Sequence, residues 1–286
     1  RCRLRDVQSD RDAAKSGEFK EPATREEKVR GAVIYEGPSS ITGEPLVVIV
    51  TGFGFHGKST NPKTGPTLQT WILCRDIHPQ EALRTGKDTA NCGDCKLRGH
   101  AGQDRACYVS LMAPNSVWKA YKAGSYTNAL APRHLAGRVV RLGAYGDPAA
   151  VPISVWRPIV QWSSGHLGYT HLWRTCDQAY KSLLMASVDT PEELVEAREL
   201  GWRTFRTRLD GEPIAPKEIV CPASLEAGHQ VQCIDCLLCD GRWERPTGRW
   251  DTRRDIVIKA HGSGAGHYRA LRSRLLGLTS RLPVLQ

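Results

Sequence analysis

The sequence predicts an α/β protein: a partial or open parallel β/α barrel preceded by a small β-rich region that contains cysteines. Short apolar runs bounded by Gly, Pro, Ser and Asn alternate with helical segments after residue 131, which is typical of parallel strands joined by crossovers. Right-handed crossovers curl such a sheet toward a barrel. Three apolar runs without intervening helices precede this part, and 286 residues suffice for both.

The chain divides into three predicted regions. Residues 1–30 mix Arg and Lys with Asp and Glu and predict a flexible arm, without the apolar stretch of a signal peptide. The β-rich region, 31–130, contains predicted strands at 32–37, 44–54 and 67–76 and predicted helices at 79–86 and 113–124. The β/α domain, 131–286, contains predicted strands at 137–148, 168–173, 182–189, 202–207, 219–224 and 255–262 and predicted helices at 152–162 and 190–201.

Residues 190–201 carry the clearest helix signals. Thr190 suits the N-cap, Pro191 the first helical position, Glu193 a capping box and Gly201 the C-cap. In the same way, Pro79 and Gly86 bound the shorter helix.

One group of four cysteines, Cys221, Cys233, Cys236 and Cys239, predicts a metal site. C-x2-C-x2-C is the core spacing of ferredoxin-type iron-sulfur ligation, and Cys221-Pro222 supplies a fourth cysteine followed by proline, although upstream. Zinc is the alternative, because four thiolates close a tetrahedron from many loop spacings. Buried or disulfide-bonded cysteines are the simplest alternative, but C-x2-C spacing is poorly suited to disulfides.

A second group contains Cys92, Cys95 and Cys107, with Cys74 or His100 as a fourth ligand. The group suits zinc with three thiolates and one further ligand, or an iron-sulfur cluster whose open iron binds a substrate or cofactor. A C-x2-C redox pair is the third interpretation.

Polar residues follow the predicted strands of the β/α domain. Asp147, His171, Asp189, Cys221 and His261 each lie at or just past a carboxyl end, the edge where β/α folds place their sites. We therefore expect Asp147, His171, Asp189 and His261 to position substrate or move protons.

A phosphate-loop pattern occurs at residues 52–59, GFGFHGKS. The following residues, TNPKTG, cannot continue the helix that a phosphate loop requires, so a hairpin loop is the preferred interpretation.

The net charge of +10 and the pI of 9.2 suit a nucleic-acid partner, although the charge is dispersed. Aromatic and basic residues that could stack on single strands follow the four-cysteine group: Trp243, Arg245, Arg249, Trp250, Arg253 and Arg254. Ten cysteines without a secretion signal indicate a reducing compartment, the cytosol, and no apolar run is long enough to span a bilayer.

Several segments together resemble a group of cysteine-rich phage and prophage proteins whose layout is similar to radical-SAM-like partial barrels. They are Cys92, Cys95, Cys107-Tyr108, RLGAYGDP at 141–148, YTH at 169–171, SVD at 187–189, Cys221-Pro222 to Cys239, and AHG at 260–262. The resemblance covers roughly residues 35–265 and implies a phage-associated metalloprotein in the host cytosol, with S-adenosylmethionine (SAM) as a candidate cofactor. The radical-SAM C-x3-C-x2-C motif is replaced by C-x2-C-x11-C ahead of the barrel.

Two functions follow from these patterns. The first is an iron-sulfur enzyme with its site on the barrel rim. The alternative is a zinc-containing nucleic-acid-binding protein without catalysis, and a scaffold that has lost catalysis is a third hypothesis.

Overall fold

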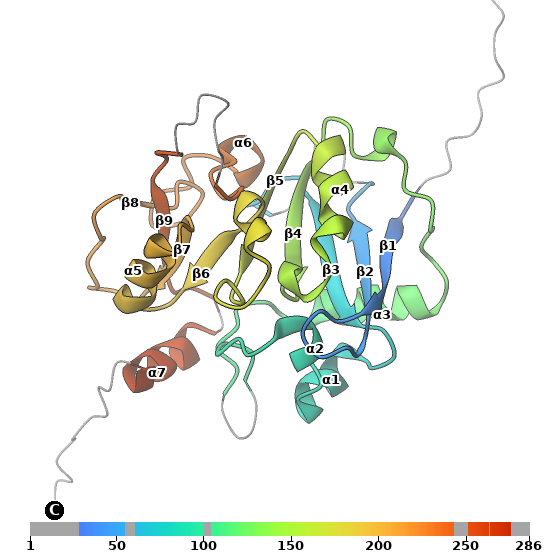
Figure 1. The fold of residues 1–286 in the computed structure, drawn as a ribbon, viewed down its shortest axis with the longest axis horizontal. Helices are drawn as coiled ribbons and strands as arrows, with labels where there is room; N and C mark the ends of the chain where they lie inside the picture. The colour runs from blue at the N-terminus through green and yellow to red at the C-terminus, as the bar shows by residue number, and fades with distance from the viewer. Residues whose placement is uncertain (1–28, 55–60, 100–103, 243–250, 263, 276–286) are drawn as a thin grey trace, which may run out of the picture.

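The computed structural model describes residues 29–54, 61–99, 104–242, 251–262 and 264–275 (Figure 1). Its strands are β1 (Gly31–Pro38), β2 (Pro45–Thr51), β3 (Leu68–Cys74), β4 (Val139–Tyr145), β5 (Gly165–Thr170), β6 (Met185–Val188), β7 (Thr204–Arg208), β8 (Glu218–Val220) and β9 (Asp255–Lys259). Its α-helices are α1 (Pro79–Thr85), α2 (Thr89–Cys92), α3 (Met112–Lys122), α4 (Trp156–Trp162), α5 (Pro191–Glu199), α6 (Cys233–Cys236) and α7 (Ala265–Leu275). The 3-10 helices are η1 (Pro132–His134), η2 (Pro148–Ala150), η3 (Ile153–Val155) and η4 (Gln178–Ser182).

These strands form one sheet in the order β1-β2-β3-β4-β5-β6-β7-β9-β8. The first three strands pair antiparallel, and every pairing from β3-β4 onward is parallel. The sheet does not close into a barrel. The predicted fold class, an open α/β arrangement preceded by a β-rich region, is therefore confirmed, and the β-rich region extends the same sheet.

Every predicted strand differs from the observed one at one or both ends, and two differ most at their start. The strand expected at 168–173 is β5, which begins at Gly165 and ends at Thr170. The hydroxyl of Thr170 accepts a hydrogen bond from the backbone N–H of Leu172 (2.9 Å), which turns the chain out of the sheet before His171 and Trp173 can extend the strand. The strand expected at 182–189 starts only at Met185, because η4 occupies the preceding residues.

The capping box expected at α5 is also rearranged. The Thr190 hydroxyl accepts from the N–H of Glu193 (3.1 Å), as predicted for an N-cap. The Glu193 carboxylate, however, accepts from the N–H of Asp189 (2.8 Å) instead of the N-cap residue. Glu193 therefore fixes the residue that directly follows β6.

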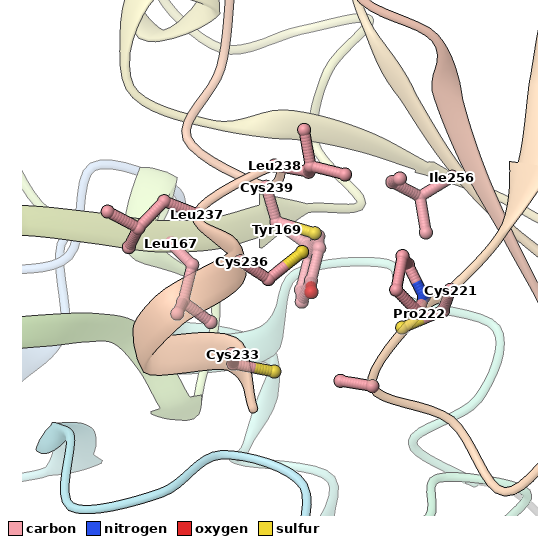
Figure 2. A pocket seen from close by; sticks show the side chains of 11 residues that line it. Leu167, Tyr169, Cys221, Pro222, Cys233, Cys236, Leu237, Leu238, Cys239 and Ile256 are labelled. Carbon is pink, nitrogen blue, oxygen red and sulfur yellow. The ribbon is translucent and has the colours of Figure 1, made fainter. Parts of the chain in front are cut away.

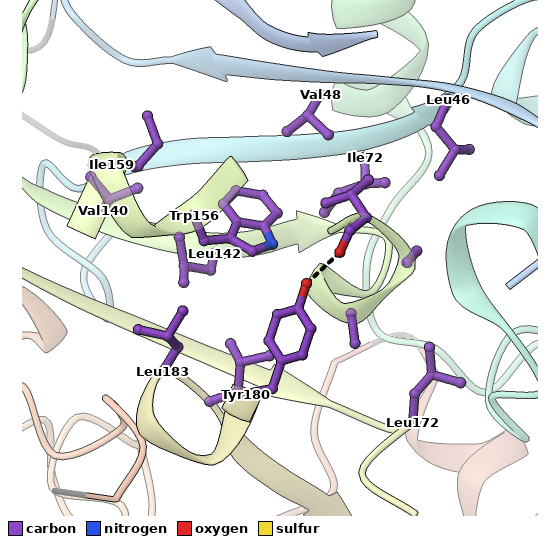
Figure 3. Close-up of a cluster of buried hydrophobic side chains, with 14 of the residues drawn as sticks. Leu46, Val48, Ile72, Val140, Leu142, Trp156, Ile159, Leu172, Tyr180 and Leu183 are labelled. Atoms are coloured by element: carbon purple, nitrogen blue, oxygen red, sulfur yellow. Dashed lines mark hydrogen bonds between the residues drawn. The ribbon is translucent and has the colours of Figure 1, made fainter. Parts of the chain in front are cut away.

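The core lies on both faces of the sheet, because alternate residues of β2 point to opposite sides. On one face, Val48 packs with the fully buried Trp156 of α4 (Figure 3). The Trp156 indole N–H donates to the carbonyl of Pro148 (2.8 Å), which satisfies its only polar atom. On the other face, Val47 packs with Val117 of α3. Helices therefore cover both faces of this half of the sheet.

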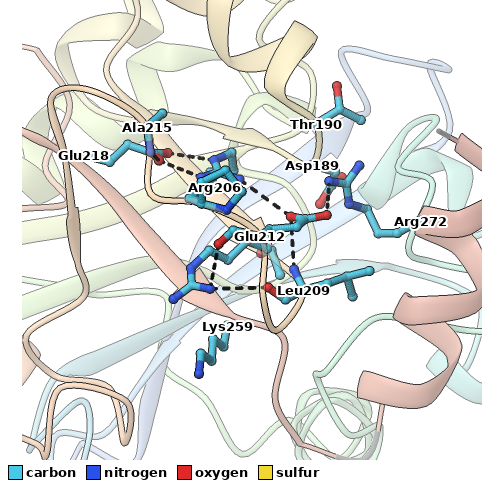
Figure 4. A network of polar contacts seen from close by, with 12 residues as sticks. Asp189, Thr190, Arg206, Leu209, Glu212, Ala215, Glu218, Lys259 and Arg272 are labelled. Carbon is cyan, nitrogen blue, oxygen red and sulfur yellow. Dashed lines mark hydrogen bonds and ion pairs between the residues drawn. The ribbon is translucent and has the colours of Figure 1, made fainter.

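The carboxyl-terminal half is held by buried ion pairs (Figure 4). Arg206 of β7 is 2 % exposed and contacts Glu218 through two hydrogen bonds of 2.7 and 2.8 Å. Arg272 of α7, fully buried, donates to Glu212 (2.8 Å). These arginines are thus unavailable to a polyanion.

Among the described helices, none combines the length and the apolar character needed to cross a bilayer.

Candidate functional site

The four polar residues predicted at strand ends lie at the carboxyl edge of the parallel sheet. Asp147 follows β4 by two residues, His171 and Asp189 directly follow β5 and β6, and His261 follows β9 by two residues. A cavity of about 360 Å³ lies at this edge, a volume within the range of small-molecule sites. Asp147, His171 and His261 line it. Asp189 reaches it through a neighbour, since its carboxyl contacts the lining residue Tyr268.

The three-cysteine group forms one wall of this cavity, which Cys92, Cys95 and Cys107 all line. Helix α2 ends at Cys92, and a tight turn brings the N–H of Cys95 to the Cys92 carbonyl (3.4 Å). The N–H of Cys107 then bonds to the carbonyl of Leu97 (2.7 Å), which returns the chain to the same place. Burial, followed by the neighbouring Cys95 thiol, raises the pKa of Cys92 well above its usual value.

Cys74, one of the two fourth ligands suggested by the sequence, does not lie in this wall. The Cys74 thiol is directed to the carbonyl of Lys87 (3.5 Å) and the side chain of Asn91 (3.6 Å), and Cys74 is not among the lining residues. His100 lies outside the described residues. His171 occupies the adjacent position instead, because its ring interacts with the Cys95 thiol.

The His171 ring contains a buried nitrogen, Nε2, that has no hydrogen-bond partner among the described residues. Burial alone would lower the pKa of His171, but Cys95, Asp189 and Asp147 together raise it well above its usual value. The backbone of His171 is fixed by Asp147, whose carboxylate accepts from the N–H groups of His171 (2.8 Å) and Ala149 (2.9 Å). Asp147 thus holds the loop, and His171 presents an unused polar atom.

The four-cysteine group lies around a smaller cavity of about 10 Å³ (Figure 2). Cys221 enters from the end of β8, and its N–H bonds to the carbonyl of Val257 on β9 (2.8 Å). Cys233, Cys236 and Cys239 come from α6 and the residues after it, across the cavity from Cys221 in this view. The remaining lining is largely apolar: Leu167, Leu237, Leu238, Ile256, Pro222, Ala223 and Tyr169. The structure therefore brings together all four cysteines that the sequence grouped.

The backbone at Leu237 explains how Cys236 and Cys239 both reach this cavity. Leu237 has φ of 50°, a left-handed conformation that is unfavourable for a leucine and reverses the chain at the end of α6. Such strain persists only where the surrounding structure enforces it.

Tyr169 lies between the two cysteine groups. Its ring lines both cavities, as does Cys233, and its hydroxyl is hydrogen-bonded to the Cys239 thiol. The other face of the ring packs on Phe205 with centroids 4.3 Å apart. Tyr169 and Cys233, with Leu167, therefore form a wall shared by the two sites.

The donor sets suit soft metals, because thiolates select zinc or iron-sulfur clusters. Burial raises the pKa of Cys233 to about 11 and also raises the pKa values of Cys236 and Cys239, so these thiols need a nearby cation to ionise at neutral pH. Within the described ranges, no three His, Cys, Asp or Glu side chains are positioned to hold a metal ion as they stand. Loading a metal therefore requires the thiols to move together.

Several cavity residues were not predicted from the sequence: Lys63, Tyr108, Arg141, Tyr169, Phe205 and Tyr268. Arg141 could have been singled out from the sequence, because it is a charged residue within the otherwise largely apolar run that forms β4. Tyr169 and Phe205 look like ordinary strand aromatics in the sequence. Of the aromatic and basic segment proposed for nucleic acid, 243–250 lies outside the described residues, and Arg253 bonds to Asp240 and Asp251 (both 2.6 Å). The phosphate-loop pattern also falls largely outside them, at 55–60.

Comparison with known proteins gave no match to a protein-family model, to a curated protein or to a solved structure.

Proposed function

We propose that this chain is an iron-sulfur enzyme with two cysteine centres whose reaction takes place in the cavity between them. One observation carries the proposal: Cys92, Cys95 and Cys107 line the cavity together with His171, and Cys233 of the second group lines the same cavity. A structural metal site would need no such shared space. Two thiol groups on one ligand-sized cavity at the carboxyl edge of a parallel sheet are what an enzyme requires.

The residues around the three-cysteine group have different roles in the proposed reaction. Cys92, Cys95 and Cys107 would hold the first cluster, which supplies an iron site for binding and electron transfer. His171 lies beside Cys95 with a buried, unpartnered nitrogen, so it is the group placed to move a proton or to bind a polar atom of the ligand. Asp147 positions His171 through its backbone N–H.

Cys221, Cys233, Cys236 and Cys239 would hold the second cluster. Their apolar surroundings exclude water, and the Tyr169 hydroxyl donates to Cys239, both of which set the reduction potential of a cluster. Because Cys233 and Tyr169 also line the large cavity, electrons could pass between this centre and a bound ligand over a short path.

The proposal includes a reducing compartment, the host cytosol of a phage-encoded protein. The nine cysteines in the described part of the chain are all free thiols, although Cys233, Cys236 and Cys239 lie close together in sequence. SAM remains a candidate cofactor for the first centre, and its involvement needs a test of its own.

Anaerobic purification followed by iron, sulfide and zinc analysis tests the proposal. We expect iron and sulfide with a visible absorption band, reduced in Cys92→Ser by the content of one centre and in Cys236→Ser by the content of the other. Cys176→Ser is the matched control, because Cys176 is a half-buried free thiol outside both groups. It should retain the full metal content.

Two results would redirect the interpretation. Colourless protein with stoichiometric zinc, lost from the same serine variants, would end the iron-sulfur version and favour the zinc-containing nucleic-acid-binding alternative. Metal content equal to wild type in both Cys92→Ser and Cys236→Ser would remove both centres. Incubation of the reduced protein with SAM then decides the cofactor, since SAM that stays intact excludes the radical reaction.

A further inference from the structure

Arg141, a half-buried residue of β4, lines the large cavity, where its guanidinium donates to the Tyr108 hydroxyl (2.6 Å). No carboxylate in the described ranges lies within ion-pairing distance (4.0 Å) of it. The fully buried arginines of the described ranges, by contrast, all have such partners: Arg203 with Asp240, Arg206 with Glu218, Arg208 with Glu226 and Arg272 with Glu212.

The other cavity arginines are already engaged. Arg98 pairs with Asp88, and Arg105 donates to the carbonyls of Cys107 (3.1 Å) and Val109 (2.7 Å). Arg141, in contrast, has one hydrogen bond to another described residue, a neutral hydroxyl, although a guanidinium offers five N–H donors. A half-buried guanidinium with N–H donors to spare suits a carboxylate or phosphate, which it can bind through two parallel hydrogen bonds.

Lys63 adds a second positive charge on the same side of the cavity. It lines the cavity from the segment before β3, and in the described ranges its ammonium forms no ion pair. Burial raises the pKa of Cys233, and Lys63 and Arg141 both oppose this effect, so both charges lie near that thiol. The carbonyl of Lys63 also accepts from the N–H of Cys233 (2.8 Å), which fixes the segment there.

Aromatic rings also lie next to Arg141 in the cavity. Tyr108, which accepts from Arg141, is half exposed and stacks on the exposed ring of His261 at 6.1 Å. Two aromatic rings therefore lie beside the Arg141 guanidinium. His171 and Cys95 line the same cavity, so they share its space with a ligand held at one end by Arg141.

We propose that the cavity binds a small substrate bearing a carboxylate or phosphate, which Arg141 and Lys63 hold while the rest of the molecule reaches His171 and Cys95. The inference rests on the proposed function for where the chemistry occurs. Anion binding itself needs no metal, so it can be measured separately.

The test is calorimetric titration of the full chain, metal-free and metal-loaded, with inorganic phosphate and with succinate. We expect saturable binding by wild type, at least tenfold weaker binding by Arg141→Gln, and an intermediate affinity for Arg141→Lys, which keeps the charge but loses the planar fork. Stronger binding of phosphate would identify a phosphorylated substrate, and stronger binding of succinate a carboxylate. Arg157→Gln, at an exposed arginine of α4, is the matched control and should bind as wild type does.

Thermal melting first establishes that each variant folds. If Arg141→Gln does not fold, the titration is carried out with Arg141→Lys in its place. The inference is overturned if wild type binds neither anion, or if Arg157→Gln weakens binding as much as Arg141→Gln. It is also overturned if Arg141→Gln loses metal but binds anions as wild type does, because Arg141 then serves only the Cys233 centre. Selective loss of anion binding supports it even if no metal binds and the proposed enzyme fails.

Discussion

The hydroxyl of Tyr268 lies 2.8 Å from the carbonyl oxygen of Thr207 and 3.1 Å from Oδ1 of Asp189. The hydroxyl donates to both acceptors, so its single proton is shared between the carbonyl and the carboxyl group. Burial raises the pKa of Asp189, whereas the positive charge of His171 and the hydrogen bond from Tyr268 oppose that rise. Helix α7 is thus connected to the residue after β6 by a tyrosine–aspartate hydrogen bond.

The first prediction concerns the pH dependence of stability. Because the folded-state pKa of Asp189 is raised, its contribution is fully present below the unfolded value of about 3.9 and is lost as pH rises through the folded pKa. Asp189→Asn keeps an oxygen that can accept from Tyr268 but cannot ionise. The free energy of unfolding of the variant relative to wild type should therefore increase with pH above about 4.

Denaturant unfolding at several pH values checks this expectation. Tyr268→Phe, which removes the hydroxyl, should make the loss of stability with rising pH steeper. Asp210→Asn is the control, since Asp210 is exposed and pairs with Lys259 at the surface. Parallel curves for wild type and Asp189→Asn would contradict a raised folded-state pKa of Asp189.

The sequence was sufficient for the fold class because apolar periodicity and turn residues are local signals. It placed Asp147, His171, Asp189 and His261 at strand ends, and parallel strands bring such ends to one edge. It could not place Arg141 or Tyr169 in the cavity, because their role depends on which residues of distant segments pack against β4 and β5. The orientation of Cys74 was equally hidden, since its hydrogen bonds are to Lys87 and Asn91.

The second prediction concerns Gly146, which precedes the loop of Asp147. Its φ is 82°, and an added Cβ would lie 2.6 Å from the carbonyl oxygen of Ile72. Gly146→Ala should cost about 2 to 5 kcal/mol of unfolding free energy, the sum of a left-handed alanine and a backbone clash. Gly137→Ala shares the positive φ, 70°, but meets nothing within 4 Å, so it should cost only about 1 kcal/mol.

Denaturant midpoints of the two variants provide the comparison. The metal content of Gly146→Ala should also fall, because the carbonyl of Asn91, next to Cys92, accepts from the N–H of Asp147 (2.7 Å). Equal losses of unfolding free energy in the two alanine variants would contradict the predicted clash. They would mean that the backbone near Ile72 moves away from the added Cβ without destabilising the fold.

The third prediction concerns the buried ion pair of Arg206 and Glu218. Glu218→Gln removes the nearer of the two carboxylates that pair with a guanidinium only 2 % exposed, and Glu212 remains 3.7 Å away. The substitution should therefore cost about 3 kcal/mol, the lower end of the loss for a broken buried pair. Glu81→Gln is the control, because Glu81 pairs with Arg84 at the surface of α1 and solvent screens that pair. Its midpoint of urea unfolding should match wild type. A similar, small effect of both substitutions would show that water reaches Arg206.

The fourth prediction concerns Tyr169 and the second cysteine centre. A hydrogen bond to a ligand sulfur stabilises the more negative, reduced state of a cluster, so removing it lowers the reduction potential. Tyr169→Phe should shift the midpoint potential of the reconstituted second centre by about 60 mV to more negative values, equivalent to about 1.4 kcal/mol for one electron.

Anaerobic redox titration of a Cys92→Ser background isolates that centre. Tyr180→Phe in the same background removes a buried hydroxyl that bonds to Val151, distant from both cysteine groups, and should leave the potential unchanged. An unshifted potential in Tyr169→Phe with full metal content would mean that the hydroxyl turns away from Cys239 once the centre is loaded.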